Sequence, residues 1–275
     1  MAVQQFLWRK GMVLDRALWI SWYDLPEDGR DAYLNWAHET YMPGILERPG
    51  FLWAAHFKSE GKPIQSGVPA GAPGRLRHTD DPSVPKGNAY VLLFAAETPH
   101  AFAHPTPRRL HAALPPDDQK MLAMRIGERA NIMIDEDRIG GPEATKRKRT
   151  EALSPCIQLG SFNAGAADED EILAWYAQWR LPSMNKLPGC VGIRKLVSVS
   201  GWAKHGVLYE FVSLEARNMH FPHHEKANPE MDAWTDTLVR HLLHAPGSPI
   251  VAVRIASAVA KKRPGEEGLE AAATV

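Results

Sequence analysis

Three residues in the first third of the chain could exchange protons with a substrate: His38, Tyr41 and His56. His38 and Tyr41 are three residues apart in a predicted helix over 28–41, so both can reach one face of that helix. His56 lies in the apolar segment 51–58, where period-two alternation predicts a β-strand. Because imidazole transfers protons near neutral pH, we predict that these three residues are catalytic and that losing His56 costs most. The alternative is structural, with His38 a partly exposed helical residue and His56 a strand residue of the core.

A second set of residues could hold a substrate near these groups. Tyr23 could donate a hydrogen bond to a substrate oxygen, and Trp side chains often line ligand cavities. Arg194 could bind a carboxylate or phenolate, although a cross-strand ion pair with Glu210 is the alternative. His78 favours an ordered lid in the long segment 59–88. The residues predicted to bind substrate are Tyr23, Trp22, Trp53, His78, Arg180, Arg194 and Glu210.

An internal repeat organises the chain. Residues 33–53 (YLNWAHETYMPGILERPGFLW) and 172–192 (ILAWYAQWRLPSMNKLPGCVG) align without a gap, at a constant offset of 139. The identical pairs are Leu34/Leu173, Trp36/Trp175, Pro43/Pro182, Pro49/Pro188 and Gly50/Gly189. Because the identities include tryptophans and Pro-Gly turns, we interpret the protein as two copies of one unit.

The same order of elements is predicted in both copies. In the second copy, strands are predicted over 156–163, 191–199, 207–214 and 249–256, with a helix that begins after the acidic residues 168–171 and ends near Pro182, and another over 231–244. In the first copy, strands are predicted over 17–24, 51–58, 89–97 and 131–135, and helices over 28–41 and 117–130. The order β-α-β-β-α-β is that of the ferredoxin-like split unit.

The chain is therefore predicted to have four parts. One ferredoxin-like repeat covers 17–138 and contains the loop 59–88, and a second covers 156–256. The segment 139–155 is predicted to be an exposed linker, and 257–275 a flexible tail. We expect the first repeat to carry the main site, because it holds the long loop and the three candidate proton-transfer residues. The second repeat has Ala177, Arg180 and Lys195 at the aligned positions.

Composition limits the classes of function. Apolar residues make up 44% and charged residues 23%, as in soluble globular domains, and 32 basic residues balance 32 acidic ones. A neutral chain has no overall charge that attracts nucleic acid or a membrane, and no apolar run is long enough for a membrane span. Two cysteines and no visible signal peptide favour the cytoplasm. The HFPHHE segment lacks zinc-ligand spacing, and dinucleotide, P-loop and GxSxG motifs do not occur, so no metal is expected.

The landmarks of the repeat resemble a known superfamily. Trp36, Pro43 and Arg48-Pro49-Gly50-Phe51, repeated as Trp175, Pro182 and Leu187-Pro188-Gly189, together with Tyr209-Glu210, are similar to the dimeric α+β barrel superfamily, with its EthD-like and polyketide-cyclase-like branches closest. The resemblance implies an α+β fold in which two tandem ferredoxin-like repeats pack sheet to sheet as an intrachain barrel. Related sequences often have His two residues before the helix-ending Pro, where this chain has Tyr41 and Arg180.

The resemblance leaves the reaction open, because the superfamily includes cofactor-free monooxygenases, cyclases, isomerases, lyases and haem enzymes. Our main hypothesis is a cofactor-independent enzyme doing acid/base chemistry, as a lyase, isomerase or cyclase, on a hydrophobic, aromatic small molecule. One alternative is an oxygen-using monooxygenase or a haem enzyme of the same fold, since one axial His is enough to hold haem. Another is a non-catalytic small-molecule-binding or stress-response protein. A homodimer remains open.

Overall fold

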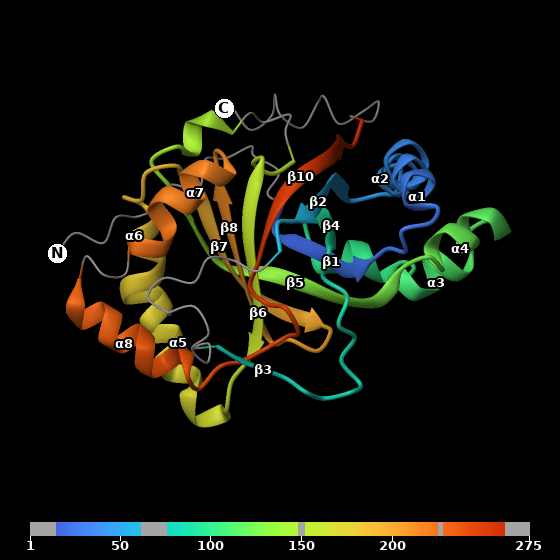
Figure 1. Cartoon of the computed structure of the whole chain (residues 1–275). Helices are drawn as coiled ribbons and strands as arrows, with labels where there is room; N and C mark the ends of the chain where they lie inside the picture. Colours follow the sequence, from blue (N-terminus) through green and yellow to red (C-terminus); the bar gives the residue numbers. More distant parts are fainter. Residues whose placement is uncertain (1–14, 62–75, 148–151, 225–227, 262–275) are drawn as a thin grey trace, which may run out of the picture.

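The closed barrel at the centre of the molecule is built from eight antiparallel strands, with helices packed on two opposite sides (Figure 1). A computed structural model describes residues 15–61, 76–147, 152–224 and 228–261. We call residues 15–147 the first half and 152–261 the second half. Each half contributes four neighbouring strands and its own group of helices, so the fold is α+β.

The first half runs through these elements: β1 (Ala17–Asp24), α1 (Arg30–Trp36), the π-helical turn η1 (Ala37–Tyr41), α2 (Met42–Leu46), β2 (Phe51–Ser59), β3 (Arg77–His78), β4 (Tyr90–Ala96), the 3-10 turn η2 (Pro99–Ala103), α3 (Pro107–Ala112), α4 (Pro116–Leu122) and β5 (Ile126–Gly140). Its barrel strands lie in the order β5-β1-β4-β2. Helices α1 to α4 cover the outer face of this sheet (Figure 1).

The first half ends with the 3-10 turn η3 (Ala144–Lys146). The second half contains β6 (Cys156–Asn163), the 3-10 turn η4 (Ala166–Asp168), α5 (Glu169–Trp175), the π-helical turn η5 (Tyr176–Arg180), α6 (Leu181–Met184), β7 (Cys190–Ser200), β8 (His205–Phe211), α7 (Leu214–His220), the 3-10 turn η6 (Phe221–His223), α8 (Pro229–Val239), β9 (Leu243–His244) and β10 (Ile250–Val259). Its barrel strands lie in the order β10-β6-β8-β7. The two sheets join where β5 pairs with β7 and where β2 pairs with β10. Closure therefore leaves no free edge on these eight strands.

The offset of 139 seen in the sequence recurs in the elements. β1 and β6, α1 and α5, and the two π-helical turns begin and end at positions that differ by that offset. The predicted helix ends, at Tyr41 in the first copy and near Pro182 in the second, are wrong, because the chain stays helical to Leu46 and Met184. A proline lacks the N–H that an α-helix requires there, and a wider π-type turn before it is a known way for a helix to accommodate this.

Two predictions for the end of the first half are also wrong. The helix predicted over 117–130 ends at Leu122, and β5 begins at Ile126, well before the predicted strand 131–135. Helix-forming residues in this segment are held in a strand because they pair with β1, so tertiary pairing overrides local propensity. β5 extends to Gly140, inside the predicted linker, whose Ala152 and Leu153 are buried in the barrel interior.

The barrel interior and the helix-covered faces hold separate apolar cores. Trp22, Trp53 and Phe57 belong to the interior core, whereas Phe51 packs under the helices of the first half. Simple alternation places Phe51 and Trp53 on one face, but the register of β2 on β4 shifts between these two residues. The bulge therefore moves Phe51 to the helix side and leaves His56 on that side as well.

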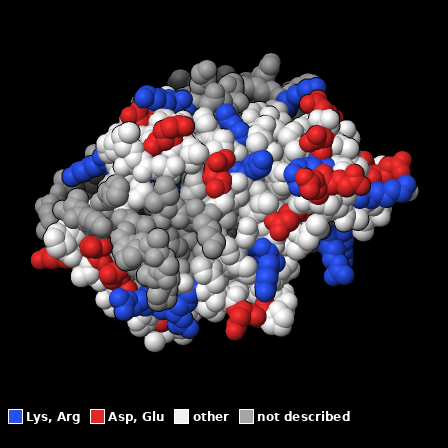
Figure 2. Space-filling model, in the orientation of Figure 1, with Lys and Arg blue, Asp and Glu red and all other residues white. Residues whose placement is uncertain are grey.

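The long connection of the first half reaches across to the second. After the segment 62–75, which lies outside the described residues, β3 pairs in parallel with β9 (Figure 1). Part of the predicted tail is the last three residues of β10, and 262–275 lies outside the description. On the face drawn in Figure 2, acidic and basic side chains are interspersed. Among the described helices, none is long and apolar enough to cross a membrane.

Candidate functional site

A chain of three hydrogen-bonded side chains lies between the sheet and the helices of the first half. The Nε2 atom of His38 is 2.9 Å from Nδ1 of His56, and Nε2 of His56 is 2.9 Å from the hydroxyl of Tyr23. His38 comes from η1, His56 from β2 and Tyr23 from β1. Two of the predicted catalytic residues therefore contact one another, and a predicted substrate-binding residue completes the chain.

Small residues around His56 make room for this chain. Ala54 shares its face of β2, and Ala256 of β10 lies directly opposite His56 in the sheet. His56 is 0% exposed, whereas His38 is only half-buried. Within the described residues, Nδ1 of His38 makes no hydrogen bond. His38 is therefore the member of the chain that a substrate can reach.

Burial sets the charge state of the three groups. It lowers the pKa of His56 well below its usual value, and His38 and the Arg125 guanidinium lower that pKa further. Burial also lowers the pKa of His38, and it raises the pKa of Tyr23, with help from Tyr33 and against Arg125. At neutral pH both imidazoles and the phenol are therefore uncharged, and the chain can hold one imidazole tautomer without carrying charge.

Arg125 supplies the positive charge of this compartment, and sequence reasoning missed it. Its guanidinium carbon lies 4.5 Å from the ring centre of Tyr23 and 5.3 Å from that of Tyr41. Nε donates to the Tyr33 hydroxyl at 2.6 Å, and Nη1 donates to Glu128 at 2.7 Å. Nη2 is buried and makes no hydrogen bond within the described residues. A buried cationic donor without an acceptor indicates a place where a water or a ligand oxygen could bind.

Tyr41 is in the same compartment but has a different partner. Its hydroxyl lies 2.7 Å from Nε2 of His111 in α3, and its ring stacks on Trp36. Burial, with Arg125 beside it, lowers the pKa of His111 to about 4, so this imidazole is neutral at pH 7. His111 and Arg125 escaped sequence analysis because one lies in an unassigned segment and the other was placed inside the predicted helix 117–130.

The structure does not bring the remaining predicted residues to this site. Trp22 and Trp53 lie in the barrel interior, on the opposite face of the sheet from His56. Arg194 binds Asp15 at 2.5 Å, its Nε lies 3.9 Å from Glu210, and Glu210 accepts a hydrogen bond from the Ser154 amide. Arg194 and Glu210 are both buried, and Arg194 lies over the ring of Trp53 in the barrel interior. This arrangement fits the cross-strand ion pair better than a substrate clamp.

Arg180 lies in the second half, and His78 lies in β3 of the first half, which pairs with β9 of the second half. The Nε atom of Arg180 donates to Tyr209 at 2.7 Å, under the helices of that half. His78, in β3, contacts the main-chain oxygen of Ser248 at 2.6 Å. Lys195, at the position aligned with His56, donates to Glu136 and contacts Nδ1 of His205. The two halves therefore place different chemistry at equivalent positions.

Within the proton-transfer chain, His56 has no ring nitrogen free for a metal ion or haem. Among the described residues, no group of three or more His, Cys, Asp or Glu is placed to hold a metal ion. Both ring nitrogens of His56 are engaged in hydrogen bonds, and the inner nitrogen of His38 is bonded to His56. An axial ligand needs a free imidazole nitrogen, so His56 does not fit this role without breaking the chain.

Comparison with solved structures supports the α+β barrel fold described above. The chain matches no family model and no curated protein. The structure of a "putative monooxygenase" from Lactobacillus acidophilus is 16% identical, with a TM-score of 0.51, and the match covers 89% of this chain and 96% of that one. An anthrone oxidase-like protein is 11% identical, with a TM-score of 0.57 and coverage of 92% and 97%. A "putative monooxygenase" from Fusobacterium nucleatum is 8% identical, with a TM-score of 0.51 and coverage of 89% and 92%. At these identities the likeness concerns the fold and not the reaction.

Proposed function

We propose that this protein is an oxygen-using enzyme that removes a proton from an aromatic small molecule at His38. The observation that carries the proposal is the hydrogen-bonded chain from half-buried His38 through buried His56 to Tyr23. The monooxygenase and anthrone oxidase names of proteins with this fold support oxygen chemistry over the lyase, isomerase or cyclase chemistry expected from the sequence. We also propose that the halves arose by tandem duplication, which the shared offset of their elements supports.

In this proposal His38 is the catalytic base. We assign the tautomer in which His38 donates its Nε2–H to Nδ1 of His56 and His56 donates its Nε2–H to the oxygen of Tyr23, across two contacts of 2.9 Å each. This arrangement leaves a lone pair on Nδ1 of His38, the nitrogen that can face a substrate. His56 and Tyr23 are then positioning residues, because they fix the tautomer and the ring orientation of His38 without touching the substrate.

The substrate that fits this chemistry has an acidic C–H beside an aromatic ring, such as a CH2 group flanked by rings. His38 would take one proton from this CH2 group, and the resulting carbanion would give its electrons to O2. In an overall oxidation of CH2 to C=O, one oxygen atom of O2 enters the product, and the other leaves as water with both hydrogens. Arg125 would stabilise the oxygen anion of a phenolate or enolate substrate through its unpartnered Nη2.

Oxygen uptake tests this function directly. The purified protein would be mixed with a panel of hydroxylated polycyclic aromatic compounds in an oxygen-electrode cell, and the products would be analysed in air and under nitrogen. We expect substrate-dependent oxygen uptake with no turnover under nitrogen. Equal turnover under nitrogen would favour the lyase, isomerase or cyclase hypothesis, and binding without turnover would favour a binding protein. A Soret band in the absorption spectrum of the purified protein would favour the haem alternative.

A further inference from the structure

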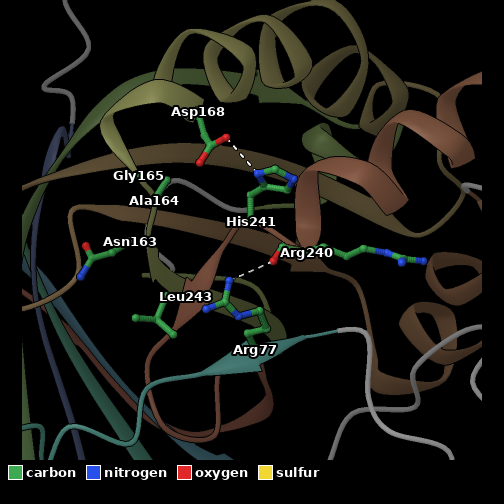
Figure 3. Close-up of a pocket in the computed structure, with 8 residues that line it drawn as sticks. All are labelled: Arg77, Asn163, Ala164, Gly165, Asp168, Arg240, His241 and Leu243. Atoms are coloured by element: carbon green, nitrogen blue, oxygen red, sulfur yellow. Dashed lines mark hydrogen bonds and ion pairs between the residues drawn. The ribbon is translucent and has the colours of Figure 1, made fainter.

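A pocket lies between the two halves, at the place where β3 pairs with β9 (Figure 3). Its volume is about 480 Å³. The walls come from three separate segments: Arg77 from β3, Ala164 and Asp168 after β6, and His241 with Leu243, the first residue of β9, after α8. None of these residues belongs to the proton-transfer chain of the first half.

Arg77 gives this pocket its positive charge. Its Nη1 atom donates to the main-chain oxygen of Arg240 at 3.4 Å, and its other guanidinium nitrogens make no hydrogen bond within the described residues. Its backbone is fixed by pairing with β9 and by the bond from the Thr79 amide to the His244 oxygen. The guanidinium of Arg240 points away from these groups in Figure 3. Arg77 is therefore an anchored cation with donors available to a ligand.

The acidic residue of the pocket is already paired. Oδ1 of Asp168 is 3.0 Å from Nδ1 of His241, so the carboxylate orients the imidazole ring (Figure 3). Pairing reduces the repulsion that Asp168 would exert on an incoming anion. Leu243 lies next to Arg77 in the same view, and Ala164 adds a second apolar contact. The lining thus combines one available cation with a small apolar surface.

We infer that this pocket binds a small organic carboxylate. The planar guanidinium of Arg77 matches the two oxygens of a carboxylate, and Leu243 and Ala164 can contact the apolar body of the acid. The site joins β3, which follows the long connection of the first half, to the second half. Binding is therefore expected to stabilise the pairing of β3 with β9 and to slow amide exchange at Thr79, which bonds the main-chain oxygen of His244.

The probe for this site is cyclohexanecarboxylate, with neutral cyclohexanecarboxamide and inorganic phosphate as comparisons. Titrations followed by amide NMR should give saturable shifts at Arg77, His241 and Leu243 with the carboxylate. The amide and phosphate should bind more weakly. Hydrogen exchange on the wild-type protein should slow at Thr79 when the carboxylate is present. These measurements need no substitution.

Two matched variants then test the role of Arg77. Arg77→Gln should weaken carboxylate binding about tenfold, the scale of one lost charge-assisted hydrogen-bonded pair. Arg240→Gln removes an equal charge whose guanidinium points elsewhere, and it should leave the affinity unchanged within about twofold. His38→Gln should leave binding unchanged, because that residue belongs to the other site.

Several results would overturn the inference. They are the absence of saturable binding, equal binding of the carboxamide, tighter binding of phosphate, or an equal loss of affinity in the Arg77→Gln and Arg240→Gln variants. If Arg77→Gln loosens the β3–β9 pairing, the chemical-shift changes and the Thr79 amide exchange of the wild-type protein still show whether the carboxylate binds at this pocket. Shifts confined to residues near His38 would place the carboxylate at the first-half site and contradict the proposal.

Discussion

Nε2 of His38 and Nδ1 of His56 lie 2.9 Å apart, although one ring is half-buried and the other is 0% exposed. The contact joins a π-helical turn to the strand beneath it. It also assigns different work to two residues that the sequence ranked in the opposite order, because the sequence predicted that loss of His56 costs most. His38 can meet a substrate, and His56 can only act through His38.

We therefore expect His38→Gln to cost more activity than His56→Gln. Loss of a general base typically lowers the rate about 100- to 10,000-fold, and His38→Gln should fall in that range. His56→Gln can still accept or donate a hydrogen bond, so we expect a loss of about 10- to 100-fold, as for residues that orient a functional imidazole. Steady-state kcat in folded variants measures both. Near-normal turnover in His38→Gln would refute the assignment of His38 as base.

The hydroxyl of Tyr23 is expected to matter more for activity than that of Tyr41. Tyr23→Phe removes the group bonded to His56, while Tyr41→Phe removes the group bonded to His111. We expect Tyr23→Phe to lower kcat about tenfold with little change in KM, because it frees the tautomer of His56. The pH at which activity falls should move in Tyr23→Phe and stay in place in Tyr41→Phe. The same pH profile for both variants would remove Tyr23 from the chain.

The secondary-structure elements around this site could be predicted from the sequence, but the contacts between their side chains could not. Strands β1 and β6 and the approximate starts of α1 and α5 were predictable, because apolar faces and Pro-Gly turns are local signals that recur at the offset of 139. It could not decide on which side of the sheet Trp53 and His56 lie. That choice depends on a one-residue register shift in β2 and on which face the helices cover.

Arg125 and His111 could not be assigned to the site from the sequence, for a related reason. They reach the site through a strand and a helix whose bounds depend on long-range pairing, and β5 overrides the helical propensity of residues 126–130. The spacing of Tyr23, Tyr33 and Tyr41 along the sequence does not show that their rings surround Arg125. Strand alternation gives two faces without naming them, so the sequence could not show that Arg194 lies over Trp53 in the barrel interior, away from His38.

Stability is expected to fall as the pH drops from about 6.5 towards 4. Burial lowers the pKa of His111 and of His244 to about 4 in the folded protein, below the usual value of 6.5. The unfolded chain therefore binds more protons in this window, and the free energy of unfolding rises with pH. At pH 5.5 a buried neutral histidine such as His244 lowers the free energy of unfolding by about 1 kcal/mol relative to its value at neutral pH.

Urea unfolding at pH 5.5 and pH 7.5 measures this effect. His244→Gln should show a smaller difference between the two pH values than the wild type. The control is His100→Gln at an exposed position, which should keep the wild-type difference. A free energy of unfolding that is independent of pH between 5 and 7 would contradict the assignment of buried neutral imidazoles.

Removing the charge of Arg125 should change the proton affinity of its neighbours. The guanidinium lowers the pKa of His56 and of His111, so both pKa values should rise in Arg125→Gln. The variant should also be less stable, because the Tyr33 hydroxyl and Glu128 lose their partner. Two-dimensional NMR of the imidazole nitrogens follows His111 directly through its titration.

If Arg125 also holds a substrate oxygen through Nη2, Arg125→Gln should raise KM for phenolic substrates more than for substrates without a hydroxyl. Arg240→Gln serves as the charge control, and equal pKa values of His111 in the wild type and in Arg125→Gln would show that the cation does not act on this compartment.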